Sequence, residues 1–403
     1  MLFINSELKD QIITSCQELI RRPSLSGNEK EVAQYIAKTM ERLGFDNVES
    51  DKFGNIIGTI ILGKGGSSIL FDGHMDHVDV SDPSKWKYDP YGGKIENNRI
   101  YGRGATDMKG NIAAMMHAAS YIKNNLRNHI DGIIYIACVV HEECFEGVAS
   151  QEVAKNYKPD FVVIGEPSGL TLKRGQRGRA ELVLETYGKT AHSSNPEIGL
   201  NAIKKMAALI VEIEKSFIPK KHDFLGKGIL EITDIISSPY PGASVVPDLC
   251  RATYDRRLLP NEAEEEILDQ IENIINMLHV KDPSLTAKVY LSEGSARCYT
   301  GATIKAKRFA PAWIYDEHHT FVQAAHTGLL SVGQKPTISH YAFCTNGSYY
   351  AGKAKIPTVG YGGSHEHLAH VTDEYIEIEH LLLACEGYIG ITRSFFKKIA
   401  KNK

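Results

Sequence analysis

The order of the predicted elements changes near residue 178, and this change limits the fold of the 403-residue chain more than any other feature. Before it, strands alternate with helices: strand-like runs between 46 and 73 precede a helix over 107–124 and an apolar strand over 132–140. A further helix-to-strand unit ends with the apolar run 161–164. Such alternation is typical of an α/β layer structure whose sheet is largely buried.

A different order follows residue 178. We expect strand, helix, two strands, helix and strand, at 180–187, 199–216, 228–237, 248–257, 261–278 and 285–292. This βαββαβ order is the ferredoxin-like pattern. The chain also exceeds the length at which one hydrophobic core usually stops growing. The sequence therefore predicts an α/β domain of residues 1–177 and 294–403, with a mixed central sheet flanked by helices, and an inserted domain of residues 178–293.

Composition excludes several classes of function. The net charge of −3 provides no global field that would recruit nucleic acid or an anionic membrane. The longest apolar run, near 133–140, is too short to span a bilayer. Seven cysteines without a CxxC pair argue against a disulfide framework, and the charged residues within 1–10 are unlike a signal peptide. We therefore expect a cytoplasmic protein that binds neither nucleic acid nor membrane.

Histidines and acidic residues gather in five segments, each where a predicted strand or helix ends, which is where α/β folds place their sites. The segments contain, in chain order, His74 and Asp76; Asp107; Glu142 and Glu143; Glu166; and His365, His367 and His370. Each segment alone is a weak signal, because surface carboxylates and polar turns have the same composition.

Spacing gives some of these residues a specific chemistry. Residues i and i+2 of a strand share a face, so Asp76 can orient a metal-binding His74, with His77 as a weaker candidate. Asp107 fits either a helix cap or a carboxylate that bridges two cations. A dinucleotide-binding fingerprint fails there, because its third glycine would have to stand at 107.

Adjacent Glu142 and Glu143 follow a buried strand, where they are costly unless hydrated or paired. One of them can bind a metal while the other acts as a general base. Three histidines within six residues near the C-terminus also favour a metal, although His365 and His367 fit surface positions equally well. An HExxH motif fails because residue 369 is alanine, and no GxSxG nucleophile elbow occurs.

Together, in the order HxD, D, EE, E and H, these segments resemble the dizinc aminoacylase/carboxypeptidase family, which includes acetylornithine deacetylase and succinyl-diaminopimelate desuccinylase. The resemblance covers nearly the whole chain. Within the family, the segments 82–86, 254–260 and 343–348 are most similar to the selenium-metabolism hydrolases.

The resemblance implies a catalytic domain that binds two divalent ions, zinc first, with cobalt or manganese able to substitute. The implied metal ligands are His74, Asp107, Glu143, Glu166 and His370. Asp107 would bridge the ions, Asp76 would orient His74, and Glu142 would act as general base. Relatives also have a cis peptide bond after the bridging aspartate, which implies one between Asp107 and Met108.

For the insert, the resemblance implies a lid that also forms a homodimer. His192 would reach the partner's site to stabilise the oxyanion, and Arg257 would bind the substrate carboxylate. Without the resemblance, His192 would be interpreted as a turn residue and Arg257 as a member of a surface ion pair. Asn346 replaces an aspartate common in relatives and is assigned to the substrate. His141 and Ser244 are further departures from the family pattern, and they bear on substrate identity.

The expected function is hydrolysis of the amide bond of small N-acyl amino acids or short peptides by a metal-activated water. An amidohydrolase of ureides or N-carbamoyl amino acids would use the same scaffold and metals. A degenerate, non-catalytic metal-binding protein is a third possibility, and the complete ligand set together with Glu142 argues against it.

Overall fold

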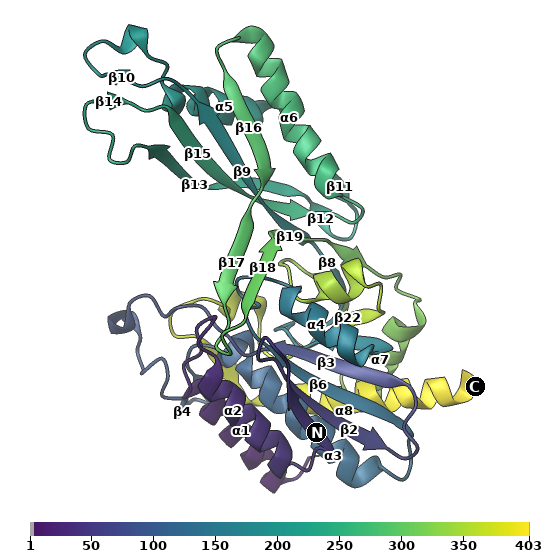
Figure 1. Cartoon of the computed structure of the whole chain (residues 1–403). Coiled ribbons are helices and arrows are strands. Elements are labelled where there is room, and N and C mark those ends of the chain that lie inside the picture. The colour runs from purple at the N-terminus through teal and green to yellow at the C-terminus, as the bar shows by residue number, and fades with distance from the viewer. Residues whose placement is uncertain (1–3, 403) are drawn as a thin grey trace. The chain divides into compact units, whose positions relative to one another are not determined.

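The computed structural model describes residues 4–402 and has two units, each with its own sheet (Figure 1). The first unit comprises the residues up to Gln176, Ser295–Lys305 and those from Trp313 onward; the second comprises Arg177–Gly294 and Ala306–Ala312. The predicted class, a mixed α/β sheet with an inserted ferredoxin-like domain, is confirmed. No helix within the described residues is long and apolar enough to cross a membrane.

A nine-stranded mixed sheet forms the core of the first unit. In order across the sheet its strands are β1 (Asn47–Ser50), β2 (Ile56–Leu62), β6 (Gly132–Val139), β3 (Ser68–His74), β7 (Phe161–Ile164), β22 (Thr358–Gly360), β8 (Leu172–Gln176) and β20 (Trp313–Ile314), with β21 (Ile338–Tyr341) also paired to β8. The central strands β6, β3, β7 and β22 run parallel to one another. Every residue of β3 is buried, as expected for a central strand covered on both faces.

Helices cover this sheet (Figure 1). They are α1 (Ser6–Ile20), α2 (Lys30–Arg42), α3 (Gly110–Leu126), α4 (Val148–Tyr157), α7 (Thr320–Ser331) and α8 (Ile378–Asn402). The helix predicted from 107 begins instead at Gly110, because Asp107 and Met108 have non-helical backbone angles within the turn η2 (Ala105–Lys109). The peptide bond between Asp107 and Met108 is cis, as the resemblance implied.

The second unit is a five-stranded antiparallel sheet with α5 (Ala202–Ser216) and α6 (Glu264–Lys281). Its strands are β13 (Ile229–Ser238), β15 (Leu249–Leu258), β9 (Gly178–Tyr187) and β16 (Thr286–Leu291), with β19 (Phe309–Ala310) also paired to β9. Alternate residues of β9 and β15 form one apolar cluster with both helices, so the helices cover the same face of the sheet.

Two boundaries differ from those expected. Helix α5 begins at Ala202 rather than at 199, because the side chain of Asn201 caps it by accepting the backbone N–H groups of Ile203 and Lys204. The segment Ala306–Ala312 belongs to the second unit rather than to the first, because β19 pairs with β9.

Candidate metal centre

Three neighbouring parallel strands carry predicted ligands at their carboxyl ends. His74 is the last residue of β3, Glu142 and Glu143 follow β6, and Glu166 lies two residues after β7. Parallel strands present their carboxyl ends at one edge of a sheet, so the fold brings these side chains together.

The ring of His74 is oriented as a metal ligand requires. Its Nδ1 donates to the backbone carbonyl oxygen of Asp76 at 3.0 Å, which leaves Nε2 to face Asp107 Oδ1 at 2.9 Å and Glu166 Oε1 at 3.5 Å. Burial alone would lower the pKa of His74, but the carboxylates of Glu166 and Asp107 raise it well above its ordinary value. A cation held by Nε2 would replace the proton there.

The second oxygen of Asp107 faces a different group of side chains. Its Oδ2 lies 3.1 Å from His370 Nε2, and Glu143 Oε2 lies 3.1 Å from the same nitrogen. The His370 side chain is 51% exposed, whereas those of His74, Asp107 and Glu143 are largely covered. The His370 side of the group is therefore open to solvent. Asp107 therefore stands between His74 and His370 with one oxygen toward each, as a bridging carboxylate must.

Unpartnered oxygens show that this group fits cations. Among the described residues, Glu142 Oε1, Glu143 Oε1 and Glu166 Oε2 are buried and accept no hydrogen bond. Burial raises the pKa of all three carboxyls, that of Glu142 and Glu166 well above the ordinary value. A buried carboxylate without a partner is costly. Mixed histidine and carboxylate ligation suits zinc and other divalent ions, so the donor set fits two such ions.

Asp76 contacts more than His74. One carboxylate oxygen lies 3.6 Å from His74 Nδ1 and accepts the backbone N–H of Glu142 at 3.1 Å. The other accepts the backbone N–H of Glu143 at 3.3 Å and the hydroxyl of Ser26 at 2.6 Å. The same carboxylate thus holds the end of β3 against the loop that carries both glutamates. Glu142 itself has a carboxylate oxygen within 4.8 Å of ligand atoms of His74 and Glu166.

The predicted substrate-binding residues have other surroundings. His192 is exposed in β10 (Ala191–His192) of the second unit, where its Nδ1 lies 2.7 Å from the hydroxyl of Ser194. Arg257, on β15, pairs with Asp255 at 2.7 Å. Their assigned roles stay predictions.

Asn346 is buried in the first unit, and both ends of its side-chain amide contact protein groups. Its oxygen accepts the backbone N–H of Gly147 at 2.8 Å, and its nitrogen donates to Asp72 at 2.8 Å. These bonds hold the start of α4 and the β3 strand together. Its predicted contact with the substrate stays a prediction. The contacts that the structure shows join two elements of the first unit.

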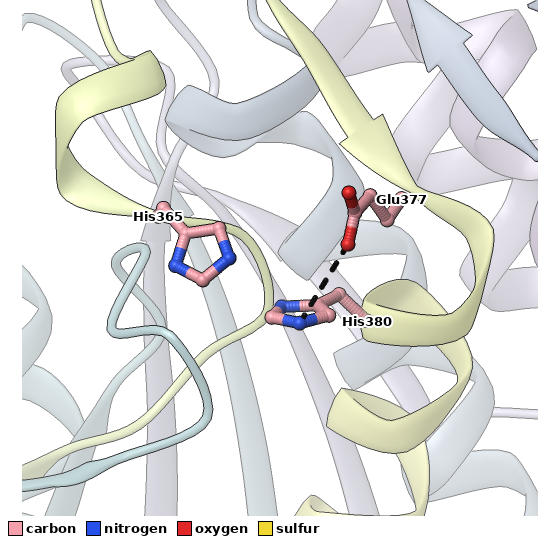
Figure 2. A group of neighbouring side chains, drawn as sticks. All are labelled: His365, Glu377 and His380. Atoms are coloured by element: carbon pink, nitrogen blue, oxygen red, sulfur yellow. Dashed lines mark ion pairs between the residues drawn. The ribbon is translucent and has the colours of Figure 1, made fainter.

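A third group that includes histidines is formed by His365, Glu377 and His380 (Figure 2). His380 Nε2 lies 3.9 Å from a carboxylate oxygen of Glu377, and the rings of His365 and His380 are 4.8 Å apart between centroids. The backbone N–H of Ser364 donates to His380 Nδ1 at 3.2 Å, which places the proton of the neutral ring on Nε2. In the neutral ring of His380, the Nε2 that faces Glu377 therefore carries the proton. At His74 the proton is on Nδ1, and Nε2 is left to face the carboxylates.

Two residues that support the centre were missed by the sequence analysis. Glu374 accepts the backbone N–H groups of Thr106 and Asp107, and it pairs with Arg103. The only signal was that Glu374 follows His370 by four residues and Arg103 precedes Asp107 by four.

The fold is shared with solved structures over nearly its whole length. The YXEP protein of Bacillus subtilis, described as a dinuclear metal binding peptidase, superimposes with a TM-score of 0.72 over 98% of this chain and 99% of its own, at 14% identity. The likeness shows a shared fold, and the donor set described above fits two divalent ions.

Sequence comparison identifies the family. Residues 70–393 match the profile of peptidase family M20/M25/M40. The uncharacterized protein YgeY of Escherichia coli K12 is 33% identical over 394 residues, which cover 94% of this chain and 93% of YgeY. Succinyl-diaminopimelate desuccinylase of Ehrlichia canis is 28% identical over 287 residues, covering 67% and 74% of the two chains. The chain belongs to peptidase family M20/M25/M40, and the predicted metal-dependent hydrolysis of amide bonds is confirmed.

Proposed function

We propose that this protein is a cytoplasmic zinc enzyme that cleaves the amide bond of small N-acyl amino acids or short peptides. One observation carries the proposal: the two oxygens of Asp107 face His74 and His370, and Glu142 lies beside this group with a buried oxygen that no other group satisfies. His74, Glu166 and Asp107 would hold one ion, and Asp107, Glu143 and His370 the other. Bound ions of this kind polarise the scissile carbonyl and lower the pKa of water.

The residues of the chain would then divide the proton transfers and the binding of the substrate. Glu142 takes a proton from the attacking water and delivers it to the leaving amine. Its position favours this role, because Glu142 lies beside the assigned ligands and keeps a buried oxygen that accepts no hydrogen bond and can take up a proton. Arg257 holds a substrate carboxylate through two parallel hydrogen bonds, which lysine cannot reproduce.

We further propose a homodimer formed through the second unit, with His192 stabilising the oxyanion in the partner's site. Two observations support this arrangement. His192 is exposed, so it is available to another chain. Strand β13 is at the edge of its sheet and exposes Ile229, Ile235 and Ile236, a surface that favours pairing with a second copy.

A substrate screen tests the reaction. Metal-free protein is loaded separately with zinc, manganese and cobalt, and each form is assayed on N-acyl amino acids, dipeptides and N-carbamoyl amino acids while its metal content is measured. We expect turnover of acyl amino acids or dipeptides, highest with zinc. Turnover of carbamoyl compounds alone would establish the ureide amidohydrolase instead. A protein that holds two ions per chain and hydrolyses none of these amides would support the non-catalytic alternative.

A further inference from the structure

A buried ion pair lies directly beside the residue assigned to bridge the two ions. Arg103 Nη1 is 2.7 Å from Glu374 Oε2, and the two side chains are 4% and 1% exposed. Each member is four residues from an assigned ligand, Arg103 from Asp107 and Glu374 from His370. The pair therefore joins the two segments that supply ligands to the second ion.

The two oxygens of Glu374 have separate partners. While Oε2 faces Arg103, Oε1 accepts the backbone N–H of Thr106 at 2.8 Å and that of Asp107 at 3.1 Å. These N–H groups lie in the turn η2, where Asp107 has non-helical backbone angles. Glu374 thus accepts hydrogen bonds from backbone N–H groups just before α3, where the helix provides no carbonyl partner for them.

Further bonds hold the two segments in register. The backbone N–H of Gly102 donates to the carbonyl oxygen of Glu374 at 2.8 Å, and the hydroxyl of Thr106 donates to the carbonyl oxygen of Tyr375 at 2.5 Å. Arg103 is fixed as well, since its guanidinium lies 5.1 Å from the ring centre of Trp86. The side chain and the backbone of Glu374 therefore both bind the segment that carries Asp107.

We propose that Glu374, held by Arg103, is a positioning residue that fixes Asp107 relative to His370 and thereby sets the affinity for the second ion. The proposal rests on the dinuclear centre proposed above. Groups that hold metal ligands in place are typically worth about 10–100-fold in metal affinity or activity. A merely structural ion pair would change the stability of the fold and leave metal affinity unaltered.

The chain offers a matched control for that distinction. Arg256 and Glu262, in the second unit, form an ion pair of 2.6 Å whose side chains are 1% and 0% exposed. Glu262 Oε2 also accepts a backbone N–H, that of Leu259, at 2.7 Å. This pair is built in the same way as the first, and its unit contains none of the assigned metal ligands.

The experiment compares Glu374→Gln with Glu262→Gln. Metal-free proteins are titrated with zinc by calorimetry, and the second ion is identified as the one whose binding Glu143→Gln weakens. We expect both glutamine variants to unfold at lower temperature and only Glu374→Gln to bind the second ion at least about tenfold more weakly. Raising the zinc concentration should then restore much of its turnover. Wild-type affinity for both ions in a destabilised Glu374→Gln protein would overturn the proposal.

A second variant keeps the test decisive if Glu374→Gln does not fold. Arg103→Lys retains the charge but loses the planar fork, so we expect a smaller loss of second-ion affinity, and an unchanged affinity would again overturn the proposal. The wild type serves as the reference for the centre itself. If it bound fewer than two ions, the dinuclear centre would fail, whereas two ions bound with equal affinity by the wild type and by both variants would refute only the role of Glu374.

Discussion

Glu142 and Glu143 are consecutive residues whose backbone N–H groups both bond to Asp76, yet their carboxylates meet different neighbours. Glu143 contacts His370, which also contacts Asp107. Glu142 approaches His74 and Glu166 and keeps a buried oxygen unpartnered. At the scale of single residues, the proposed separation of metal binding from proton transfer therefore depends on which way two adjacent side chains point.

This separation predicts different outcomes for two equivalent substitutions. Glu142→Gln should lower kcat by about 10²–10⁴-fold and leave metal content nearly unchanged, because a base is lost and a ligand is not. Glu143→Gln should instead weaken the binding of one ion. Elemental analysis and steady-state kinetics on both variants check this. The assigned roles are wrong if Glu142→Gln keeps substantial activity or loses metal as readily as Glu143→Gln.

A buried histidine in α3 predicts acid sensitivity that does not involve the metal centre. His117 Nε2 lies 2.8 Å from the hydroxyl of Ser15, and burial lowers the pKa of His117 to about 4. A pKa below the unfolded value of about 6.5 means that the folded state binds fewer protons. The associated stability is present above pH 6.5 and is lost as the pH falls toward 4, by at most about 3 kcal/mol.

The test is His117→Gln, which keeps a polar group and cannot become charged. Urea unfolding in the presence of a chelator at pH 7 and pH 5 should show a smaller acid-induced loss of stability in this variant than in the wild type. His318→Gln, at an exposed position, is the control and should behave as the wild type does. An equal acid-induced loss in all three proteins would contradict the prediction.

At the scale of elements, the sequence predicted the strands well, and the residues that it named as ligands lie close together where they follow such strands. Apolar runs such as 132–140 end at polar residues, and the carboxyl ends of parallel strands are where side chains converge. Contacts between remote segments left no such signal. Arg103 and Glu374 are 271 positions apart, and Asn346 meets Asp72 across 274. Because the two members of each pair are so far apart in the sequence, no local pattern links them, and the pairs appear only once the chain is folded.

Packing between two loops gives a prediction at the same scale. Gly362 follows β22, and a Cβ atom there would lie 2.4 Å from the backbone oxygen of Glu166 and 2.7 Å from that of Gly165. Backbone atoms cannot move aside cheaply, so Gly362→Ala should lower stability by about 1–3 kcal/mol or more and displace Glu166. Gly242→Ala, whose nearest neighbours would be 3.7 Å away, is the control. Thermal unfolding and zinc content measure both effects, and equal results for the two variants would contradict this account.

At the scale of the whole molecule, the proposed homodimer predicts complementation between inactive chains. Glu142→Gln lacks the base and His192→Ala lacks the group acting on the partner's site. In randomly mixed dimers, about a quarter of all sites would have both residues intact if His192 acts in trans, and none if it acts within its own chain. Mixing the two variants should therefore restore part of the activity. If subunit exchange is demonstrated and no activity returns, His192 acts in its own chain or is a turn residue.

The pairing of β19 with β9 has a consequence for how such a protein diversifies. Arg179 is opposite Ala310, and Ala180 is opposite Phe309, so the strand that begins the insert and the strand that ends it lie one strand spacing apart, about 4.8 Å. Because its two ends are neighbouring strands, the insert separates the flanking parts of the first unit in space no more than a short hairpin would. Insertions and deletions within Arg177–Gly294 can therefore accumulate during evolution without changing the assigned metal ligands, all of which lie outside it, provided that Ser295–Lys305, which belongs to the first unit, is kept.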